Sequence, residues 1–127
     1  MLEVIKTDQG TPPGGHYSQG IRVGNFLFTA GQIAYNPETD ELVTGSIEEE
    51  TRQVMKNLSA IARAAGTSLS NTVKTTVFLT DMRLFARFNA AYAEFFPESP
   101  PARSTIHVGP LLREVHLEIE AIFYVPD

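Results

Sequence analysis

The strongest constraint on the fold is a strict alternation near the end of the chain, in the stretch VHLEIEAIFYV at residues 115–125. Side chains of a β-strand point alternately to the two faces of a sheet. One face of this stretch is apolar throughout and comprises Val115, Leu117, Ile119, Ala121 and Phe123. The other face combines His116, Glu118, Glu120, Ile122 and Tyr124. We therefore predict a strand with one buried face. The mixed face fits either a subunit interface or cleft, or an antiparallel sheet face partly in contact with water.

The remaining pattern predicts further strands and two helices in one continuous domain, residues 1–127, without repeats or a linker. The Gly24-Asn25 dipeptide is typical of a tight hairpin turn between two apolar-rich segments. An exposed loop is expected over 35–45. The predicted strands cover 2–7, 17–23, 26–34, 71–80, 104–108 and 115–125. This order indicates an α+β fold, with a mixed six-stranded sheet and both helices on one face.

The first helix is expected to begin at Ser46, because Glu49 three residues later completes a capping box. Gly66 is expected to end it. Apolar residues recur at helical spacing between these points: Ile47, Val54, Leu58, Ile61, Ala62 and Ala65.

The second helix is expected to start at the capping residue Asp81 and to end before Pro97. It carries an aromatic stripe, which we interpret as core packing against the sheet rather than as a cofactor site. The stripe consists of Phe85, Phe88, Tyr92, Phe95 and Phe96.

One sheet face has no helix to cover it. The segment 71–80 nevertheless carries apolar or β-branched residues on both of its faces. An uncovered apolar sheet face favours association, so we predict a homo-oligomer with its sites between chains.

Composition narrows the classes of function that the chain can have. The 127 residues contain no cysteine, which fits a reducing compartment and rules out a thiol nucleophile. No signal-like start and no apolar run long enough to cross a bilayer are present, so a cytoplasmic protein without a membrane partner is expected. The formal net charge of −5 disfavours nucleic acid as a partner.

Few residues are left to carry chemistry. His16, His107 and His116 lack the spacing of metal ligands, so no metal is expected, and neither a phosphate-binding loop nor a G-x-S-x-G elbow is present. What remains is Arg103, the glutamates at 118 and 120, and the polar segment HYSQG.

Arg103 follows Pro100 and Pro101 at the entry to a strand, where rigid backbone holds it among small residues. Such an arginine is a surface charge, one half of a structural Arg–Glu ion pair, or a fixed fork for a carboxylate. A glutamate in a partly apolar cleft has a raised pKa and can move protons to and from water. Together, these groups fit cofactor-independent hydrolysis of a small carboxylate-bearing substrate.

Three blocks, GGHYSQGIRVGNFLFTAGQI, VKTTVFLTDMRLFARFNAAYAEFF and PPARSTIHVGPLLREVHLEIEAI, closely resemble the YjgF/Rid family of enamine and imine deaminases. The similarity runs over nearly the whole chain. The resemblance implies a chorismate-mutase-like fold and a homotrimer with three clefts between subunits. It also implies hydrolysis of imines such as 2-iminopropanoate, formed from 2-aminoacrylate, to 2-oxo acids and ammonia, without a cofactor.

Through the same resemblance, Arg103 corresponds to the clamp for the substrate carboxylate, and Glu118 to the residue that positions and activates water. Tyr17 corresponds to the aromatic residue that closes the cleft, and Gly31 to a glycine that allows backbone close to the ligand. Asn89 matches a family position for which we favour a structural role.

The chain departs from the family pattern at three places. Thr105, which we include among the substrate-binding residues, stands where many members carry cysteine, so that only the backbone carbonyl is retained. His16 lies beside the expected cleft, and PLLREV lacks the usual Leu-Pro pair before the last strand. These changes leave open a deaminase of a larger, aminomuconate-type enamine.

Three other functions compete with imine hydrolysis. A non-catalytic trimer that binds 2-oxo acids would need Arg103 but not Glu118. An endoribonuclease is disfavoured by the charge. Chorismate-mutase chemistry is suggested by the fold alone and would require several cations around a dianion.

Overall fold

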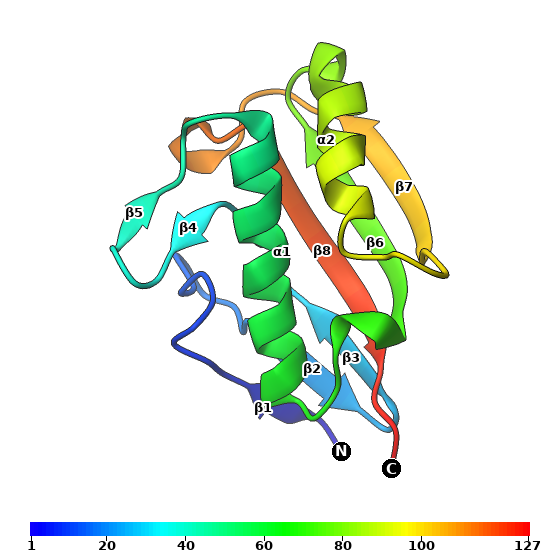
Figure 1. Ribbon diagram of the computed structural model, residues 1–127. Coiled ribbons are helices and arrows are strands. Elements are labelled where there is room, and N and C mark those ends of the chain that lie inside the picture. Colours follow the sequence, from blue (N-terminus) through cyan, green and yellow to red (C-terminus); the bar gives the residue numbers. More distant parts are fainter.

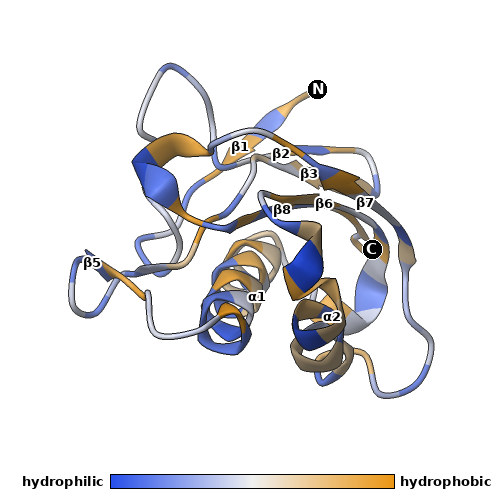
Figure 2. Ribbon diagram, turned by 90° about the horizontal axis from the view of Figure 1, so that it is seen from above, coloured by the Kyte–Doolittle hydropathy of each residue, from blue (hydrophilic) through white to orange (hydrophobic).

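A computed structural model describes residues 1–127, and strand β8 (Leu117–Tyr124) runs through the middle of its main sheet. The strand order is β1-β2-β3-β8-β6-β7, with β1 (Glu3–Ile5), β2 (Gly20–Val23), β3 (Phe26–Thr29), β6 (Thr72–Leu79) and β7 (Ala102–His107). The strands β6 and β7 pair in parallel and all other neighbours are antiparallel. Both α-helices, α1 (Ile47–Ala64) and α2 (Phe85–Ala93), lie on one face of this sheet (Figures 1 and 2). The predicted α+β class and mixed six-stranded sheet are confirmed.

The alternation that predicted β8 is confirmed by its burial. Leu117, Ile119 and Phe123 are fully buried beneath the helices, and Ala121 is nearly so. Glu118 and Ile122 on the other face are partly buried, whereas Glu120 and Tyr124 are exposed. The mixed face of β8 is thus the sheet face that no helix covers.

Helix α1 begins and ends as its sequence predicts. The Ser46 hydroxyl oxygen accepts a hydrogen bond from the Glu49 N–H at 3.1 Å, and Gly66 adopts the left-handed backbone that ends the helix, with φ +88°. The hydrophilic parts of α1 lie away from the sheet (Figure 2), and its six predicted apolar residues are buried. No helix in the chain is both long and apolar enough to cross a membrane.

The second helix is shorter than predicted. A 3-10 turn, η2 (Met82–Leu84), precedes α2, because the Asp81 carboxylate accepts the Arg83 N–H and caps this turn instead of the α-helix. Phe95 and Phe96 follow the end of α2. The aromatic residues still form one packed run, with neighbouring ring centroids 5.0–6.2 Å apart along Phe85, Phe88, Tyr92 and Phe96.

The expected loop over 35–45 contains a small two-stranded sheet, so the prediction of a plain loop is wrong there. Its strands are β4 (Tyr35–Asn36) and β5 (Glu41–Leu42). Tyr35 is buried and its hydroxyl donates to the Asp40 carboxylate, which sits in a left-handed turn with φ 58°. A buried tyrosine with a satisfied hydroxyl holds this hairpin against the domain.

Strand β3 is also shorter than the predicted 26–34, because the regular pairing with its neighbours ends at Thr29 and resumes only as a single bridge between Gln32 and Ile119 of β8. Strands β1 and β2 are shorter than predicted as well. β1 covers three residues of the predicted 2–7, and β2 starts at Gly20 instead of residue 17. The other two 3-10 turns are η1 (Leu69–Asn71) and η3 (Leu112–Glu114).

The uncovered sheet face is apolar, as the sequence indicated. Large apolar side chains on it are 39–51% exposed in the single chain, namely Val4, Val23, Phe26, Phe28, Ile106 and Tyr124. Such a face favours contact with another apolar surface. The homo-oligomer therefore stays a prediction, and the uncovered sheet face is the surface through which the copies would associate.

Candidate functional site

Three of the predicted site residues lie together at one cavity of about 490 Å³. Glu118 reaches it from the uncovered face of β8, Gly31 from the segment after β3, and Tyr17 from the loop before β2. The other lining residues are Thr11, Pro12, Gly14, Ala30, Ile33, Leu112 and Arg113. The wall is thus largely apolar or small, with one carboxylate inside, which is the usual composition of a small-molecule site.

Gly31 and Glu118 are in unusually close contact. A Cβ added to Gly31 would lie 2.0 Å from Oε2 of Glu118, 2.6 Å from its Cδ and 2.8 Å from its Cγ. The glycine is therefore required for the carboxylate to occupy this position. Burial, and secondly the negative charge of Glu120, raise the pKa of Glu118 above its ordinary 4.5. A carboxyl group with a raised pKa is suited to accept and return protons near neutral pH.

Tyr17 lies at the outside of this cavity. Its side chain is 53% exposed, and its hydroxyl oxygen accepts the backbone N–H of Gly14 at 3.0 Å. The neighbouring His16 is exposed and does not line the cavity. The tyrosine thus lines the cavity, whereas His16 does not reach it within one chain.

A buried network of amides holds the two loops that form this cavity. The Asn57 amide of α1 donates to the backbone carbonyls of Ile33 at 3.0 Å and Tyr35 at 2.8 Å. Gln32 Oε1 accepts the Thr11 N–H at 3.0 Å. Asn57 is fully buried and Gln32 nearly so. These positioning residues were not predicted, although the place of Asn57 on the apolar side of α1, three residues after Val54, was a signal.

Arg103 does not line this cavity, and its guanidinium is held firmly elsewhere in the molecule. One guanidinium N–H donates to Asn89 Oδ1 at 2.9 Å, and the guanidinium carbon lies 4.9 Å from the ring centroid of Tyr92, 5.5 Å from that of Phe85 and 5.7 Å from that of Phe88. The expectation that small residues surround Arg103 is wrong, because the aromatic stripe of α2 packs against it. The stripe therefore supports the cation as well as the core.

No carboxylate neutralises Arg103 within the chain. Three ion pairs join Arg52 to Glu94, Arg83 to Asp81 and Arg87 to Glu48, and the Glu50 carboxylate contacts the His116 ring. Arg103 lines a cavity of about 380 Å³ between α2 and the two prolines that precede β7. An ordered arginine at a cavity, without a carboxylate partner in the chain, is chemically suited to bind an anion.

Arg103 and Glu118 lie on opposite faces of the sheet. Residues paired across neighbouring strands share a face. Arg103 pairs with Thr75, which pairs with Ala121, and both of these are buried beneath the helices. Glu118 pairs with Phe78 on the uncovered face. A structural ion pair between Arg103 and Glu118 within one chain is therefore excluded.

Thr105 shares the face and the strand of Arg103. Its hydroxyl oxygen is buried and has no hydrogen-bond partner within the chain. A buried polar atom without a partner is uncommon in folded proteins. Among the predicted site residues, Thr105 thus stands near Arg103, apart from the group formed by Tyr17, Gly31 and Glu118.

His116 has a structural contact that the sequence did not reveal. The carboxylate of Glu50, which is 3% exposed, accepts the backbone N–H of His116 at 3.1 Å and its Nδ1–H at 2.7 Å. This contact anchors the start of β8 to α1. No group of three or more histidine, aspartate or glutamate residues lies together in a way that could hold a metal ion.

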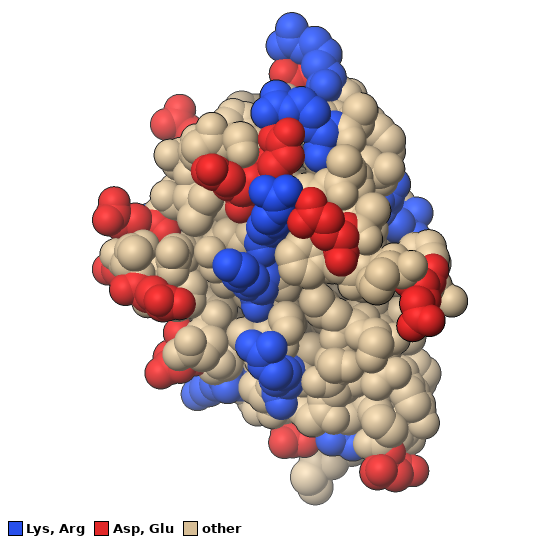
Figure 3. Space-filling view, in the orientation of Figure 1, with Lys and Arg blue, Asp and Glu red and all other residues tan.

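Basic side chains form a row along α1, with acidic side chains beside them (Figure 3). The basic residues of this helix are Arg52, Lys56 and Arg63, and Arg52 is neutralised by Glu94 with 3.0 and 2.8 Å hydrogen bonds. The row is therefore short and partly neutralised. Binding to phosphate backbones requires several free cations in line.

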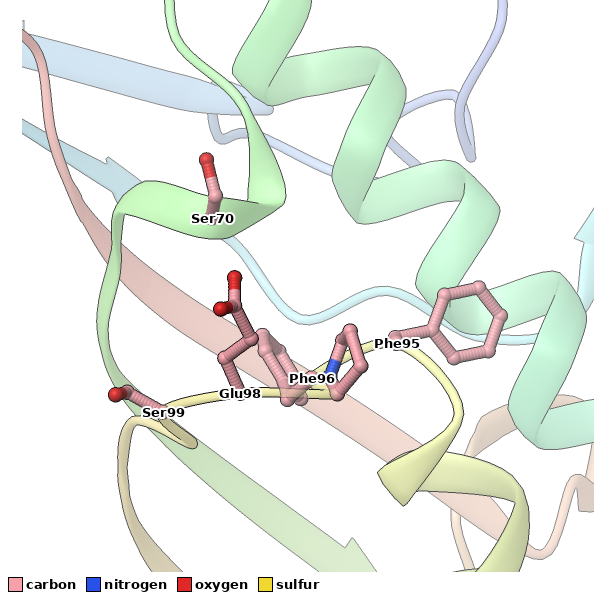
Figure 4. A pocket seen from close by; sticks show the side chains of 6 residues that line it. Ser70, Phe95, Phe96, Glu98 and Ser99 are labelled. Atoms are coloured by element: carbon pink, nitrogen blue, oxygen red, sulfur yellow. The ribbon is translucent and has the colours of Figure 1, made fainter.

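A separate cavity of about 290 Å³ lies between η1 and the segment after α2 (Figure 4). Ser70, Glu98 and Ser99 supply its polar side chains, beside Phe95 and Phe96. None of the predicted site residues reaches it, so this cavity is separate from both Arg103 and Glu118.

Known proteins resemble this chain over nearly its whole length. The profile of the endoribonuclease L-PSP family matches residues 8–125. A RutC family protein of Pyrococcus horikoshii is 52% identical over 124 residues, which cover 98% of each chain. Reactive Intermediate Deaminase A of Arabidopsis thaliana is 41% identical over 120 residues, covering 94% of this chain and 64% of that one.

The solved structures include Escherichia coli TdcF with bound serine. It is 37% identical to this chain, with a TM-score of 0.93, and the match covers 98% of this chain and 99% of TdcF. At this identity and TM-score, the backbone that carries Arg103, Glu118, Tyr17 and Gly31 follows a shared fold.

Proposed function

Because the chain belongs to the endoribonuclease L-PSP (RutC/Rid) family, which includes a reactive intermediate deaminase, we propose that it hydrolyses small imines of 2-oxo acids. The substrates are of the 2-aminoacrylate and 2-iminopropanoate type, and the products are a 2-oxo acid and ammonia. One observation carries the proposal: Arg103 is held rigidly by Asn89 and aromatic rings without any carboxylate partner in the chain. A substrate with a carboxylate group would supply the partner that Arg103 lacks.

The site would lie between two copies of the chain. Arg103 and Glu118 occupy opposite faces of one sheet, so a single copy cannot bring them to the same small molecule. The exposed apolar face that surrounds Glu118 supports contact with a neighbouring copy, whose Arg103 would then face this glutamate. We propose the homotrimer with three clefts on this ground.

The reaction would divide between the two residues. The Arg103 guanidinium would hold the substrate carboxylate in a two-pronged contact and fix the neighbouring imine carbon. Glu118 would accept a proton from water as the oxygen forms its bond to that carbon, and would return this proton to the nitrogen as the C=N bond becomes single. In the resulting carbinolamine, Glu118 would move the hydroxyl proton to the nitrogen as the C–N bond breaks, so that ammonia and the 2-oxo acid form and the carboxylate is restored. An enamine substrate would first take a proton at carbon to become the imine.

The first experiment measures imine consumption directly. An amino-acid oxidase releases free imines, and semicarbazide traps those that are not hydrolysed. The chain should lower the initial rate of semicarbazone formation, and both Arg103→Ala and Glu118→Ala should abolish this effect. Arg63→Ala, on the exposed side of α1, is the matched control and should behave as the unmodified chain. Folded protein that changes no trapping rate for any amino acid would contradict the proposal.

Mixing the two inactive variants tests whether the site is shared. In a cyclic assembly formed at random from equal amounts of Arg103→Ala and Glu118→Ala chains, half of the copies supply each intact group, so about one quarter of the sites would be complete. The mixture, unfolded and refolded together, should recover about one quarter of the original activity. Recovery no higher than that of either variant alone would argue against a site between copies.

A metabolite-binding role without catalysis is the second candidate, because TdcF has been solved with bound serine. Under this alternative, Glu118→Ala would bind 2-oxo acids normally, and no imine would be consumed by the unmodified chain. An endoribonuclease activity, to which the family name refers, would instead show RNA cleavage that falls steeply with salt.

A further inference from the structure

The cavity that contains Glu118 also contains a cation that has no role in the proposed hydrolysis. Arg113, from η3, is the single lysine or arginine among its lining residues. Figure 1 shows η3, in orange, on the side of α1 where β4 and β5 lie. The cavity is thus lined by a glutamate of the sheet and by an arginine of the loop before β8.

The backbone at Arg113 is held in an unusual conformation. Arg113 has φ 62° and ψ 18°, and the next residue, Glu114, has φ 57°. Two consecutive left-handed residues with a Cβ are rare, and they persist only where the surroundings fix them. Strained backbone of this kind is concentrated at ligand sites, and in this loop it places an arginine at a cavity wall.

Arg113 has no counter-ion within the chain. It belongs to none of the ion pairs, and its guanidinium makes no hydrogen bond to another side chain or to the backbone. Its positive charge acts on Tyr35, where it lowers the pKa against the larger upward effect of the hydrogen bond to Asp40. The pKa of Glu118, in contrast, is governed by burial and by Glu120. Arg113 and Glu118 thus both line the cavity without forming an ion pair with each other.

The cavity is larger than a three-carbon imine requires. Its volume of about 490 Å³ falls in the range of pockets that enclose drug-sized ligands. A substrate held by its first carboxylate and attacked beside Glu118 would extend its side chain into the remaining space, toward the Arg113 side.

We propose that Arg113 is a specificity-determining residue that binds a second carboxylate, on the substrate side chain, so that the site prefers imines of acidic amino acids. This inference rests on the proposed function. The planar guanidinium matches a carboxylate in two parallel hydrogen bonds, and its contribution increases when the ligand excludes water. A neutral side chain of equal length would leave this cation without a partner.

The test compares two five-carbon imines that differ in side-chain charge. The acidic imine is 2-iminoglutarate, released from glutamate by a glutamate oxidase, and the neutral imine is released from norvaline by an amino-acid oxidase. The ratio of kcat/KM for the acidic over the neutral imine should exceed one. It should fall about tenfold or more in Arg113→Gln, the scale of one lost charged hydrogen bond. Arg113→Lys, which keeps the charge but not the fork, should fall between the two, and Arg63→Gln should leave the ratio unchanged.

Binding of the products separates this inference from the proposed function. Calorimetry with 2-oxoglutarate and 2-oxopentanoate gives the same acidic-to-neutral comparison without any reaction. If no imine is hydrolysed but Arg113→Gln selectively weakens 2-oxoglutarate, imine hydrolysis is wrong and the role of Arg113 stands. If imines are hydrolysed and the ratio is the same in Arg113→Gln, the role of Arg113 is wrong. Binding of neither acid, without hydrolysis, overturns both.

Discussion

Replacing Gly31 with alanine should disable Glu118 without unfolding the protein. The added Cβ would lie 2.0 Å from Oε2 of Glu118, and the Cδ and Cγ atoms would be 2.6 and 2.8 Å away. Three side-chain atoms are involved, so rotating the terminal carboxylate does not relieve the contact. Gly31 itself does not adopt a left-handed φ, and alanine therefore introduces no backbone strain.

The size of the effect follows from the displacement. Restoring an ordinary contact distance of about 3.4 Å requires the carboxylate oxygen to move by roughly 1.4 Å, since 3.4 − 2.0 = 1.4. A misplacement of about 1 Å of a reacting group costs on the order of 100-fold in rate. We therefore expect kcat/KM for imine hydrolysis to fall about 100-fold in Gly31→Ala. The melting temperature should change little, because a half-buried glutamate can swing toward solvent.

The assay is the semicarbazide competition, with circular dichroism and sedimentation to verify fold and assembly. Gly109→Ala is the matched control, because an added Cβ there meets no atom within 4 Å. Adding Gly31→Ala to Glu118→Gln should cost little further activity, because both changes act through one side chain. Near-normal kcat/KM in Gly31→Ala would refute the reasoning, as would a loss that multiplies fully with that of Glu118→Gln.

Two further predictions concern stability. Because the pKa of Glu118 is raised above 4.5, ionising this carboxyl costs free energy in the folded protein once the pH rises through its folded pKa. Glu118→Gln should therefore raise the melting temperature at pH 7, and this gain should vanish as the pH falls below 4.5. A gain in melting temperature that grows toward acidic pH would contradict this prediction. Asn57→Ala removes the side-chain donor to the buried carbonyl of Tyr35 and one of several donors to that of Ile33, so chemical denaturation should show a loss of about 1–3 kcal/mol. Ser59→Ala, in the middle of the same helix, is its control and should cost less than about 1 kcal/mol.

The sequence predicted those elements whose pattern is local. The alternation in β8 and the cap and stop of α1 depend on neighbouring residues, and the structure reproduces them. The small β4–β5 sheet was missed because its two-residue strands are too short to show a period, and a buried tyrosine holds it. The shortening of β3 also has a non-local cause, since Gln32 makes only a single bridge to Ile119 of β8 while its side chain binds the Thr11 N–H.

The site was predicted as a set of residues but not as an arrangement. Residue chemistry singled out Arg103 and Glu118 and the family resemblance added Tyr17 and Gly31, yet no local pattern reveals that Arg103 and Glu118 lie on opposite faces. That relation depends on strand order and on the register between β6, β7 and β8, which are separated along the chain. The rings that hold Arg103 were taken for core packing alone, because helical spacing does not show which neighbour a stripe meets.

The placement of Arg103 and Glu118 on opposite faces provides a physical reason for the uncovered apolar sheet face. A carboxylate on an apolar surface is costly to bury, and burial by a second copy would add to the desolvation that already raises the pKa of Glu118 in the single chain. The same contact would remove Phe26, Phe28 and Tyr124 from water, which favours association by roughly 25 cal/mol for each Å² of apolar surface covered. Apolar burial would thus offset the desolvation of the glutamate. Because Arg103 cannot reach Glu118 in its own chain, it stays free of a permanent carboxylate partner until two copies and a substrate meet.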